Sequence, residues 1–388
     1  MMLAKKILLL GGLLAFSSFC FGQDSKPVVV IDQSARFSIY VEPISGPNSA
    51  EMTRILEDDL KMSGSFNLVA QSSATLIAEG VYAGQVLTGK LTPYGQSPSF
   101  NRVFEGDWRQ AVHLFADAIV KSVTGVPGIA STRVAFISSS TGSKEVYVMD
   151  IDGSNVVQLT NDKSISLGPK WSPNGKEIAY TSYCKNFPDV WIINLATSRR
   201  KRVAFFPGLN AQPAFSPDGE TIALTLSKDG NTELYMLPVS GGSPTRLTQT
   251  RGTEASPTWS PAGDQIAFVS DDRGSIQLFA ISSKGRPMKK IDTNSFYTTE
   301  PDWSPDGKMM AYSTRIGGQF QIAVTSLETG KQMILTSYGN NETPSWTRDS
   351  RHLVYARDGN LYLLDSLTKQ SLQIKNNLTR NSEPNCSR

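Results

Sequence analysis

The chain has 388 residues, of which 39% are hydrophobic and 19% are charged, and its formal net charge is +3. This length is enough for two domains, or for one large repeat domain with a small companion. A charge so close to neutral argues against nucleic acid and against an anionic membrane surface as partners.

The first 22 residues have the pattern of a secretory signal peptide. Lys5 and Lys6 precede an apolar stretch over 7–19 that is too short to span a bilayer comfortably, and small residues favour cleavage before Gln23. Cleavage there removes two lysines and lowers the net charge from +3 to +1. Cys20 offers the alternative of a lipid anchor, but the residues before it lack the side chains that such a site needs. We therefore expect a mature protein that begins at residue 23 and does not insert into a membrane.

Residues 23–128 carry no repeat, and their pattern predicts a small α/β domain. The stretches 38–42 and 67–70 favour strands, and apolar residues at helical spacing predict a helix over 49–61. A second amphipathic helix is predicted from Asp107 onward, and the Gly-Val-Pro-Gly segment at 125–128 is the natural linker to the next domain.

The segment 129–388 repeats a motif of the form Pro-x-Trp-Ser-Pro-Asp-Gly. Its aromatic residue recurs with a period of 44, 44, 44 and 43, at Trp171, Phe215, Trp259, Trp303 and Trp346. Each motif is followed by three short alternating runs, and four strands in such a period make one blade of a β-propeller. We expect the first Pro to begin the innermost strand, Ser-Pro-Asp-Gly to form a turn, and the aromatic ring to fill the wedge between blades.

The sequence predicts six blades and a closed ring. The second-strand core occurs six times, but its first copy at 134–136 has no motif ahead of it. The C-terminal segment 382–386 resembles 299–303 in spacing, with Cys386 in the place of Trp303. We therefore expect the C-terminal segment to return as the innermost strand of the first blade, which removes the free edges of the ring.

No motif predicts an enzyme, a cofactor or a metal site. The sequence has no Gly-x-Ser-x-Gly elbow and only two histidines, of which His113 is expected to be a satisfied helix residue and His352 a surface strand residue. Segment 149–155 superficially resembles a calcium loop, but it lacks the final Glu and is expected to be a hairpin turn. Cys184 and Cys386 are expected to be unpaired.

Polar residues precede each innermost strand and would surround one mouth of the propeller channel. Glutamates recur there at 254, 300, 342 and 383, with Asn, Gln and Thr beside them. This acidic rim is a candidate binding surface. The alternative is that loop ends are simply polar.

The chain resembles the TolB family of the Tol–Pal envelope system. The resemblance is carried by the signal peptide, the α/β domain and the order of the six blades, and also by Leu60–Asn67 and the Trp108 helix that leads to Gly125. The chain departs from the family by being short between 70 and 107. The resemblance implies a non-enzymatic periplasmic adaptor, monomeric outside its complexes, that supports outer-membrane integrity and cell division.

Two partners follow from this resemblance. The family's peptidoglycan-associated lipoprotein, Pal, docks at the propeller mouth, and the rim residues that match are Glu254, Thr299, Glu300, Asn341 and Glu342. The family's extended N-terminal segment engages the inner-membrane protein TolA, and the matching residues are Val28, Val29, Val30, Ile31 and Asp32. Such an apolar segment could add as a strand to another protein's sheet. The alternative is an ordinary first strand of the α/β domain.

Two functions of other classes stay open. A secreted propeller hydrolase or lyase would use the rim glutamates as acid and base, which requires a defined separation between them. A carbohydrate-binding propeller would need exposed aromatic residues at the rim, where Tyr297 and Tyr338 are the candidates.

Overall fold

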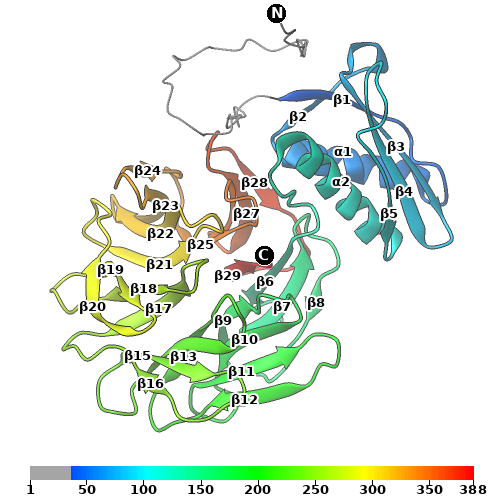
Figure 1. The fold of residues 1–388 in the computed structure, drawn as a ribbon. Coiled ribbons are helices and arrows are strands. Elements are labelled where there is room, and N and C mark those ends of the chain that lie inside the picture. Colours follow the sequence, from blue (N-terminus) through cyan, green and yellow to red (C-terminus); the bar gives the residue numbers. More distant parts are fainter. Residues whose placement is uncertain (1–35) are drawn as a thin grey trace, which may run out of the picture.

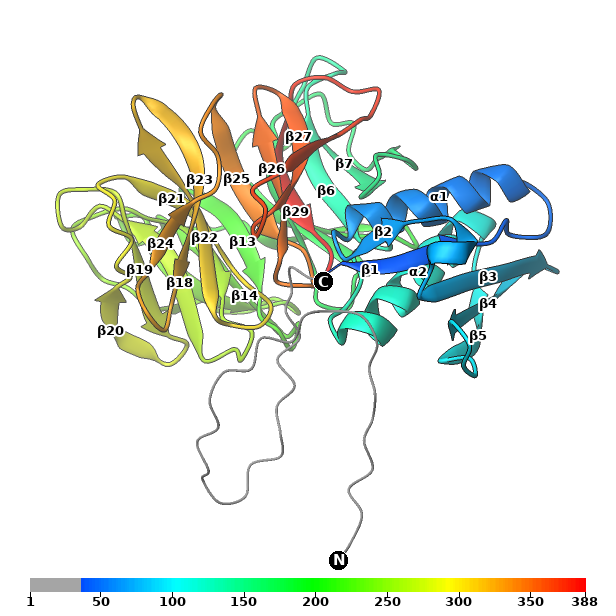
Figure 2. The same cartoon turned by 90° about the horizontal axis from the view of Figure 1, so that it is seen from above.

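The computed structural model describes residues 36–388, which form an α/β unit on the outer side of a ring of six small sheets (Figures 1 and 2). The predicted signal peptide and the segment Val28–Asp32 lie outside the described residues. Within 36–388, no helix is long and apolar enough to cross a membrane. The predicted architecture, an α/β unit followed by a six-bladed propeller, is confirmed.

The α/β unit contains one five-stranded sheet with the order β2-β1-β3-β4-β5. β1 pairs in parallel with β2 and β3, whereas β3, β4 and β5 form antiparallel hairpins. One apolar core joins the sheet to both helices. The elements are β1 (Phe37–Val41), α1 (Ser49–Met62), β2 (Phe66–Leu68), the short 3-10 helix η1 (Gln71–Ser73), β3 (Leu76–Ala83), β4 (Val86–Pro93), β5 (Phe100–Glu105) and α2 (Trp108–Thr124).

Helix α2 begins and ends at local signals in the sequence. The Asp107 carboxylate accepts hydrogen bonds from the backbone N–H groups of Arg109 and Gln110, which satisfies two donors at the first turn. Gly125 follows the last turn with φ of 75°, a left-handed conformation that glycine adopts without strain. The two predicted helices are therefore confirmed.

Each blade is a four-stranded antiparallel sheet, and the C-terminal strand completes the first blade as predicted. From blade 1 to blade 6, the innermost strands are β29 (Asn381–Cys386), β9 (Ser166–Trp171), β13 (Asn210–Phe215), β17 (Glu254–Trp259), β21 (Thr298–Trp303) and β25 (Asn341–Trp346). The second strands are β6 (Arg133–Ser138), β10 (Glu177–Ser182), β14 (Thr221–Leu226), β18 (Gln265–Ser270), β22 (Met309–Ile316) and β26 (His352–Arg357). The third strands are β7 (Glu145–Asp150), β11 (Asp189–Asn194), β15 (Glu233–Pro238), β19 (Gln277–Ser282), β23 (Gln319–Ser326) and β27 (Asn360–Asp365). The outer strands are β8 (Val157–Gln158), β12 (Arg200–Ala204), β16 (Thr245–Arg246), β20 (Gly285–Lys290), β24 (Gln332–Ile334) and β28 (Ser371–Ile374).

Every innermost strand has a β-bulge at its proline. In blade 5, Thr299 pairs with Ser313 and Asp302 pairs with Ala311, so Glu300 and Pro301 bulge out of the ladder. The residue before the proline has φ between 52° and 58° in all six blades, at Gly168, Gln212, Ser256, Glu300, Thr343 and Glu383. The prediction that the proline begins the strand is therefore wrong. The strand begins three residues earlier, and the bulge accommodates a residue that has no N–H to donate.

The motif's aromatic rings lie between blades, as predicted. Trp259 of blade 4 packs in one cluster with Ala223 and Leu234 of blade 3. Its indole N–H donates to the carbonyl of Ala214 in blade 3, and the Trp346 indole donates in the same way to Asp302 in blade 5. Trp259 and Trp346 therefore contribute both buried area and a directed bond to the neighbouring blade, whereas the Trp303 indole donates to Gly307 of its own blade.

A truncation of Trp346 tests this wedge. We expect Trp346→Ala to lower the unfolding free energy by about 3–5 kcal/mol, because the side chain is almost completely buried. Trp346→Phe should cost only about 1–2 kcal/mol, because it keeps most of the volume and loses one hydrogen bond. Urea unfolding measures both values. Equal losses in the two variants would show that the indole bond, and not the ring volume, dominates.

Candidate functional site

The innermost strands surround a cavity of about 630 Å³ at one mouth of the channel. Its wall includes all six bulge residues, because the bulge turns the residue before the proline toward the axis. Long and short side chains alternate around the ring. Blades 1, 3 and 5 present Glu383, Gln212 and Glu300, whereas blades 2, 4 and 6 present Gly168, Ser256 and Thr343.

The long side chains connect the blades in pairs. The Glu383 carboxylate accepts a hydrogen bond of 2.6 Å from the backbone N–H of Gly168. Gln212 accepts one of 2.8 Å from the N–H of Ser256. In the third pair, Glu300 accepts one of 2.8 Å from the N–H of Thr343. In each pair, the backbone N–H of the left-handed bulge residue therefore donates to a side chain of the preceding blade. Because three such pairs alternate around the ring, the mouth has approximate threefold symmetry.

Glu300 is a half-buried acid within this ring. Burial raises its pKa to about 7, and the carboxylates of Glu342 and Glu383 push the pKa in the same direction. Hydrogen bonds from the Ser313 hydroxyl and the Thr343 N–H oppose the rise. The Glu383 pKa is also raised by burial, although the Lys144 ammonium lies 3.9 Å away. The mouth therefore carries a partly protonated acidic floor at neutral pH.

The five predicted rim residues all lie at the starts of β17, β21 and β25, but they differ in access. Glu254 and Asn341 are completely buried. Glu254 accepts hydrogen bonds from Thr250 and Ser270, and burial raises its pKa to about 7. Asn341 donates to the carbonyls of Tyr338 and Gly339 and so holds its own loop. The three others, Thr299, Glu300 and Glu342, are partly exposed.

Apolar loops around the mouth were not predicted from the sequence, apart from Tyr338. Of the ten large apolar side chains that are exposed on the described propeller, six lie on this face, five in loops and one at the end of β22. We call them the apolar collar: Ile165, Phe187, Phe205, Phe296, Ile316 and Tyr338. Phe296 is 92% exposed and lies just before β21. Four of the collar residues, Ile165, Phe205, Phe296 and Tyr338, lie shortly before the innermost strand of a blade, and an apolar residue in such a polar loop is the signal that could have indicated this surface.

Neither histidine of the sequence lines the mouth. His113 lies in α2, and His352 lies at the start of β26, at the opposite end of its blade. The prediction that His352 is a surface residue is wrong, because its ring is buried and its Nδ1 lies 2.6 Å from Asp349. Cys184 and Cys386 are free thiols.

Comparison with known proteins identifies the family. A family model described as TolB beta propeller domain matches residues 120–387. The chain belongs to the TolB family. A Tol-Pal system protein TolB of Chromobacterium violaceum is 30% identical over 204 residues, which are 45% of this chain and 48% of that protein. A protein of the same description from Desulfosudis oleivorans is 43% identical over 93 residues, or 24% of this chain and 21% of that protein.

These matches span about a fifth to a half of the curated TolB relatives. The fold extends further than the sequence similarity. The crystal structure of TolB from Acinetobacter baumannii superposes with a TM-score of 0.82 at 24% identity, and it covers 91% of this chain and 96% of its own. The α/β unit and the propeller therefore share the TolB arrangement.

The half-buried Glu300 at the mouth predicts a pH dependence of stability. The folded protein holds a proton on Glu300 up to about pH 7, whereas the unfolded chain releases it near the ordinary value of 4.5. Stability from this group is therefore complete below about pH 4.5 and is lost as the pH rises through 7. Glu300→Gln keeps an acceptor for the Thr343 N–H and has no proton to lose. The unmodified protein should lose unfolding free energy between pH 4.5 and 7, and the Glu300→Gln variant should lose on the order of 2 kcal/mol less over the same range. Urea unfolding at a series of pH values measures both losses.

Gln212→Glu is the matched control, because Gln212 has the same place in blade 3 but is exposed. An acid in water keeps its ordinary pKa, so this variant should hardly change the pH slope. If Glu300→Gln left the slope as it is in the unmodified protein, a protonated Glu300 in the folded state would be ruled out.

Proposed function

We propose that the protein is a periplasmic, non-enzymatic adaptor of a Tol–Pal system that supports outer-membrane integrity and cell division. Membership in the TolB family and the similarity to Tol-Pal system proteins support this role. The observation that carries it is the chemistry of the mouth. An acidic floor is surrounded by the exposed apolar collar, and neither of the chain's two histidines is near it. This surface suits the burial of a protein segment.

The first proposed partner is the peptidoglycan-associated lipoprotein Pal, at the mouth. Exposed aromatic residues such as Phe296 and Tyr338 supply large contact area at low entropic cost, and such residues dominate binding energy at interfaces. Arg357 already lies over the Tyr338 ring at 4.4 Å, which holds that ring in place. Glu300 and Glu342 would then accept hydrogen bonds from groups of the inserted segment.

The second proposed partner is a TolA-like inner-membrane protein, bound by the segment Val28–Asp32. In the described sheet, β1 lies between β2 and β3, so the place of a first strand in the α/β unit is already taken by Phe37–Val41. This supports the interpretation in which the preceding apolar segment pairs with another protein. A strand added to a sheet edge gains affinity from backbone hydrogen bonds.

The collar is tested by replacing two of its aromatic residues. We expect Phe296→Ser combined with Tyr338→Ser to weaken binding of lipid-free Pal from the same organism by about 30-fold, the equivalent of a 2 kcal/mol hot spot. Leu367→Ser with Leu372→Ser is the matched control, because both leucines are exposed but lie away from the mouth. Isothermal titration calorimetry measures both. Equal affinities for the two double variants would move the Pal site away from the mouth, and absence of Pal binding to the unmodified protein would end the adaptor proposal.

The segment is tested by deletion. We expect removal of residues 23–34 to abolish capture of the periplasmic domain of TolA, because the pairing strand is lost, while Pal still binds at the mouth. Co-purification of the three proteins in pairs measures this. Retention of TolA by the shortened protein would show that the segment is not the binding element.

A further inference from the structure

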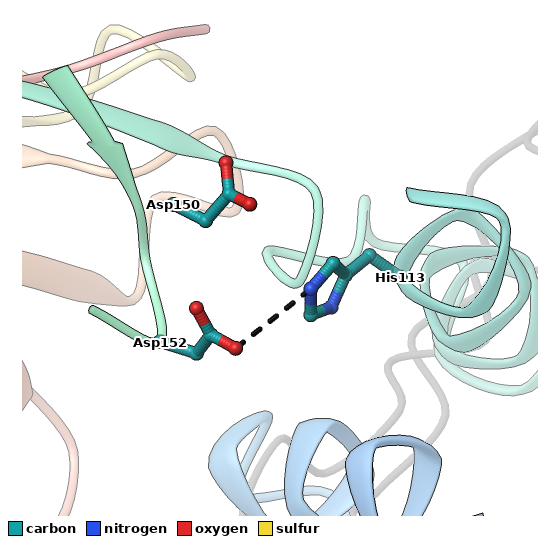
Figure 3. Close-up of side chains that lie close together, drawn as sticks. All are labelled: His113, Asp150 and Asp152. Carbon is teal, nitrogen blue, oxygen red and sulfur yellow. Dashed lines mark ion pairs between the residues drawn. The ribbon is translucent and has the colours of Figure 1, made fainter. Parts of the chain in front are cut away.

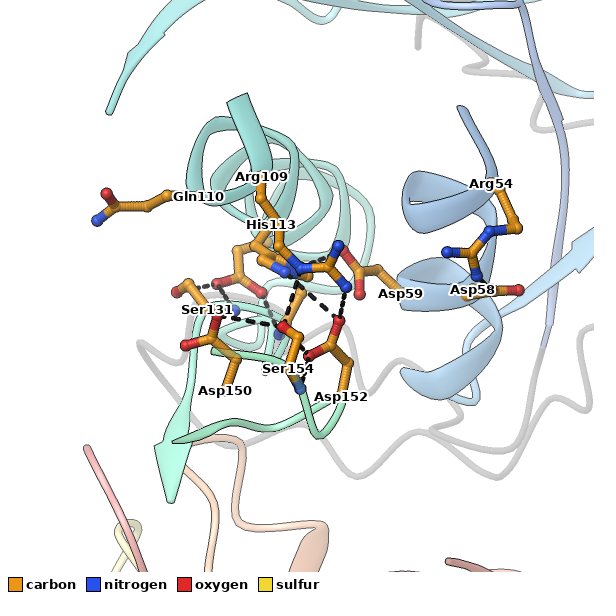
Figure 4. Close-up of polar contacts among 12 residues, drawn as sticks. Arg54, Asp58, Asp59, Arg109, Gln110, His113, Ser131, Asp150, Asp152 and Ser154 are labelled. Carbon is orange, nitrogen blue, oxygen red and sulfur yellow. Dashed lines mark hydrogen bonds and ion pairs between the residues drawn. The ribbon is translucent and has the colours of Figure 1, made fainter. Parts of the chain in front are cut away.

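A charged cluster lies where the α/β unit meets blade 1 (Figure 4). Helix α2 faces the hairpin turn between β7 and β8. Arg109 pairs with the carboxylate of Asp152 and donates through Nε to the Ser154 hydroxyl at 2.9 Å. The predicted hairpin over 149–155 is confirmed, with Gly153 at φ of 88° and its N–H bonded to the Asp150 carbonyl. Its Asp-x-Asp spacing directs the carboxylates of Asp150 and Asp152 toward α2 (Figure 3).

His113 is aimed into this cluster and is only half satisfied. The residue is 2% exposed. Its Nδ1 lies 2.7 Å from the Asp59 carboxylate, whereas its Nε2 has no hydrogen-bond partner among residues 36–388. Nε2 points toward Asp152, whose nearest oxygen is 3.8 Å away (Figure 3). A buried ring nitrogen without a partner costs free energy, so this arrangement needs a reason. The prediction of a satisfied helix histidine holds only for Nδ1.

Three possible metal ligands meet at this point. One imidazole nitrogen of His113 and one oxygen each from Asp150 and Asp152 all lie within 4.8 Å of one another, and Nε2 is the nitrogen that lies 3.8 Å from Asp152. Tetrahedral zinc with bonds of about 2.1 Å brings its ligand atoms to about 3.4 Å apart, so side-chain shifts of roughly 1 Å would close the site. Asp152 would then share its carboxylate between the ion and Arg109.

The surroundings favour a cation at this position. The carboxylates of Asp59, Asp150 and Asp152 face the imidazole, and Arg109 pairs with Asp152 among them. Arg133 lies opposite Asp150 in the β6–β7 ladder, but its guanidinium donates to the Gly175 carbonyl and stacks on Trp171. The cluster therefore holds more negative than positive charge when the imidazole is neutral.

We propose that His113, Asp150 and Asp152 bind one divalent transition-metal ion, with zinc as the best match, and that the ion ties helix α2 to blade 1. An imidazole nitrogen among the ligands favours zinc over magnesium or calcium, which prefer oxygen. Asp59 accepts from Nδ1 and so leaves Nε2 as the lone-pair donor, which is the usual support of a zinc-bound histidine. Water would complete the coordination.

Calorimetric titration of chelator-treated protein, residues 23–388, with zinc chloride tests the proposal. We expect one site, no binding by His113→Gln, and an affinity at least about 10-fold lower for Asp150→Asn. Asp218→Asn is the control, because Asp218 is an exposed aspartate in the turn between β13 and β14 of blade 3, away from the cluster. Cys184→Ser removes a partly exposed thiol that could bind zinc adventitiously, and it should leave the affinity unchanged.

A second measurement does not depend on variants that could misfold. X-ray absorption of the zinc-loaded unmodified protein should show one imidazole and oxygen ligands without sulfur. Absence of binding up to about 1 mM zinc, a sulfur ligand, or equal affinities for Asp150→Asn and Asp218→Asn would each overturn the proposal. If zinc did not bind, His113 would have only a structural role, as a histidine between the carboxylates of Asp59 and Asp152.

Discussion

The propeller depends on one backbone feature, the left-handed residue that precedes the proline in each innermost strand. Five of these six residues are not glycine, so each carries conformational strain that the surrounding structure must offset. The bulge accommodates the proline, whose missing N–H would otherwise break the ladder. It also turns a backbone N–H and a side chain toward the axis. Pairs such as Glu300 and Thr343 use both groups to connect neighbouring blades.

Closure of the ring adds a second constraint, because blade 1 combines strands from the two ends of the propeller sequence. Cys386 pairs with Val134 at the place where Trp303 pairs with Met310 in blade 5. A thiol fills less of the wedge than an indole does. Bonds partly replace the lost contact, since the Cys386 N–H and the Asn385 amide both donate to the Ser345 hydroxyl of blade 6. The C-terminal copy of the motif, which has Cys386 in place of the aromatic residue, can therefore close the ring because these hydrogen bonds to blade 6 hold it.

The repeat made the six-bladed fold predictable from the sequence. The features that form the two candidate sites do not follow the repeat and could not be predicted from it. A period of 44 residues with six second-strand cores is enough to predict six blades. The bulges could not be predicted, because a proline near a strand start is compatible with several registers. Burial of Glu254 accompanies its contact with Thr250 in the preceding loop, and burial of His352 accompanies its contact with Asp349 in the preceding turn. The contact of His113 with Asp152 joins two parts of the chain that share no pattern.

Carboxylates are partly or fully buried both at the propeller mouth and at the contact between blade 1 and the α/β unit, but different groups stabilise them. Burial of a carboxylate is costly unless donors or cations compensate. At the mouth, the compensation comes from backbone N–H groups that the bulges supply to Glu300 and Glu383. At the contact, Arg109 compensates Asp152, while the imidazole of His113 is satisfied at one nitrogen alone. Blade 1 carries residues of both places, with Glu383 near one end of the sheet and Asp150 at the other. An ion at the contact would therefore hold the α/β unit on the same sheet that forms part of the mouth.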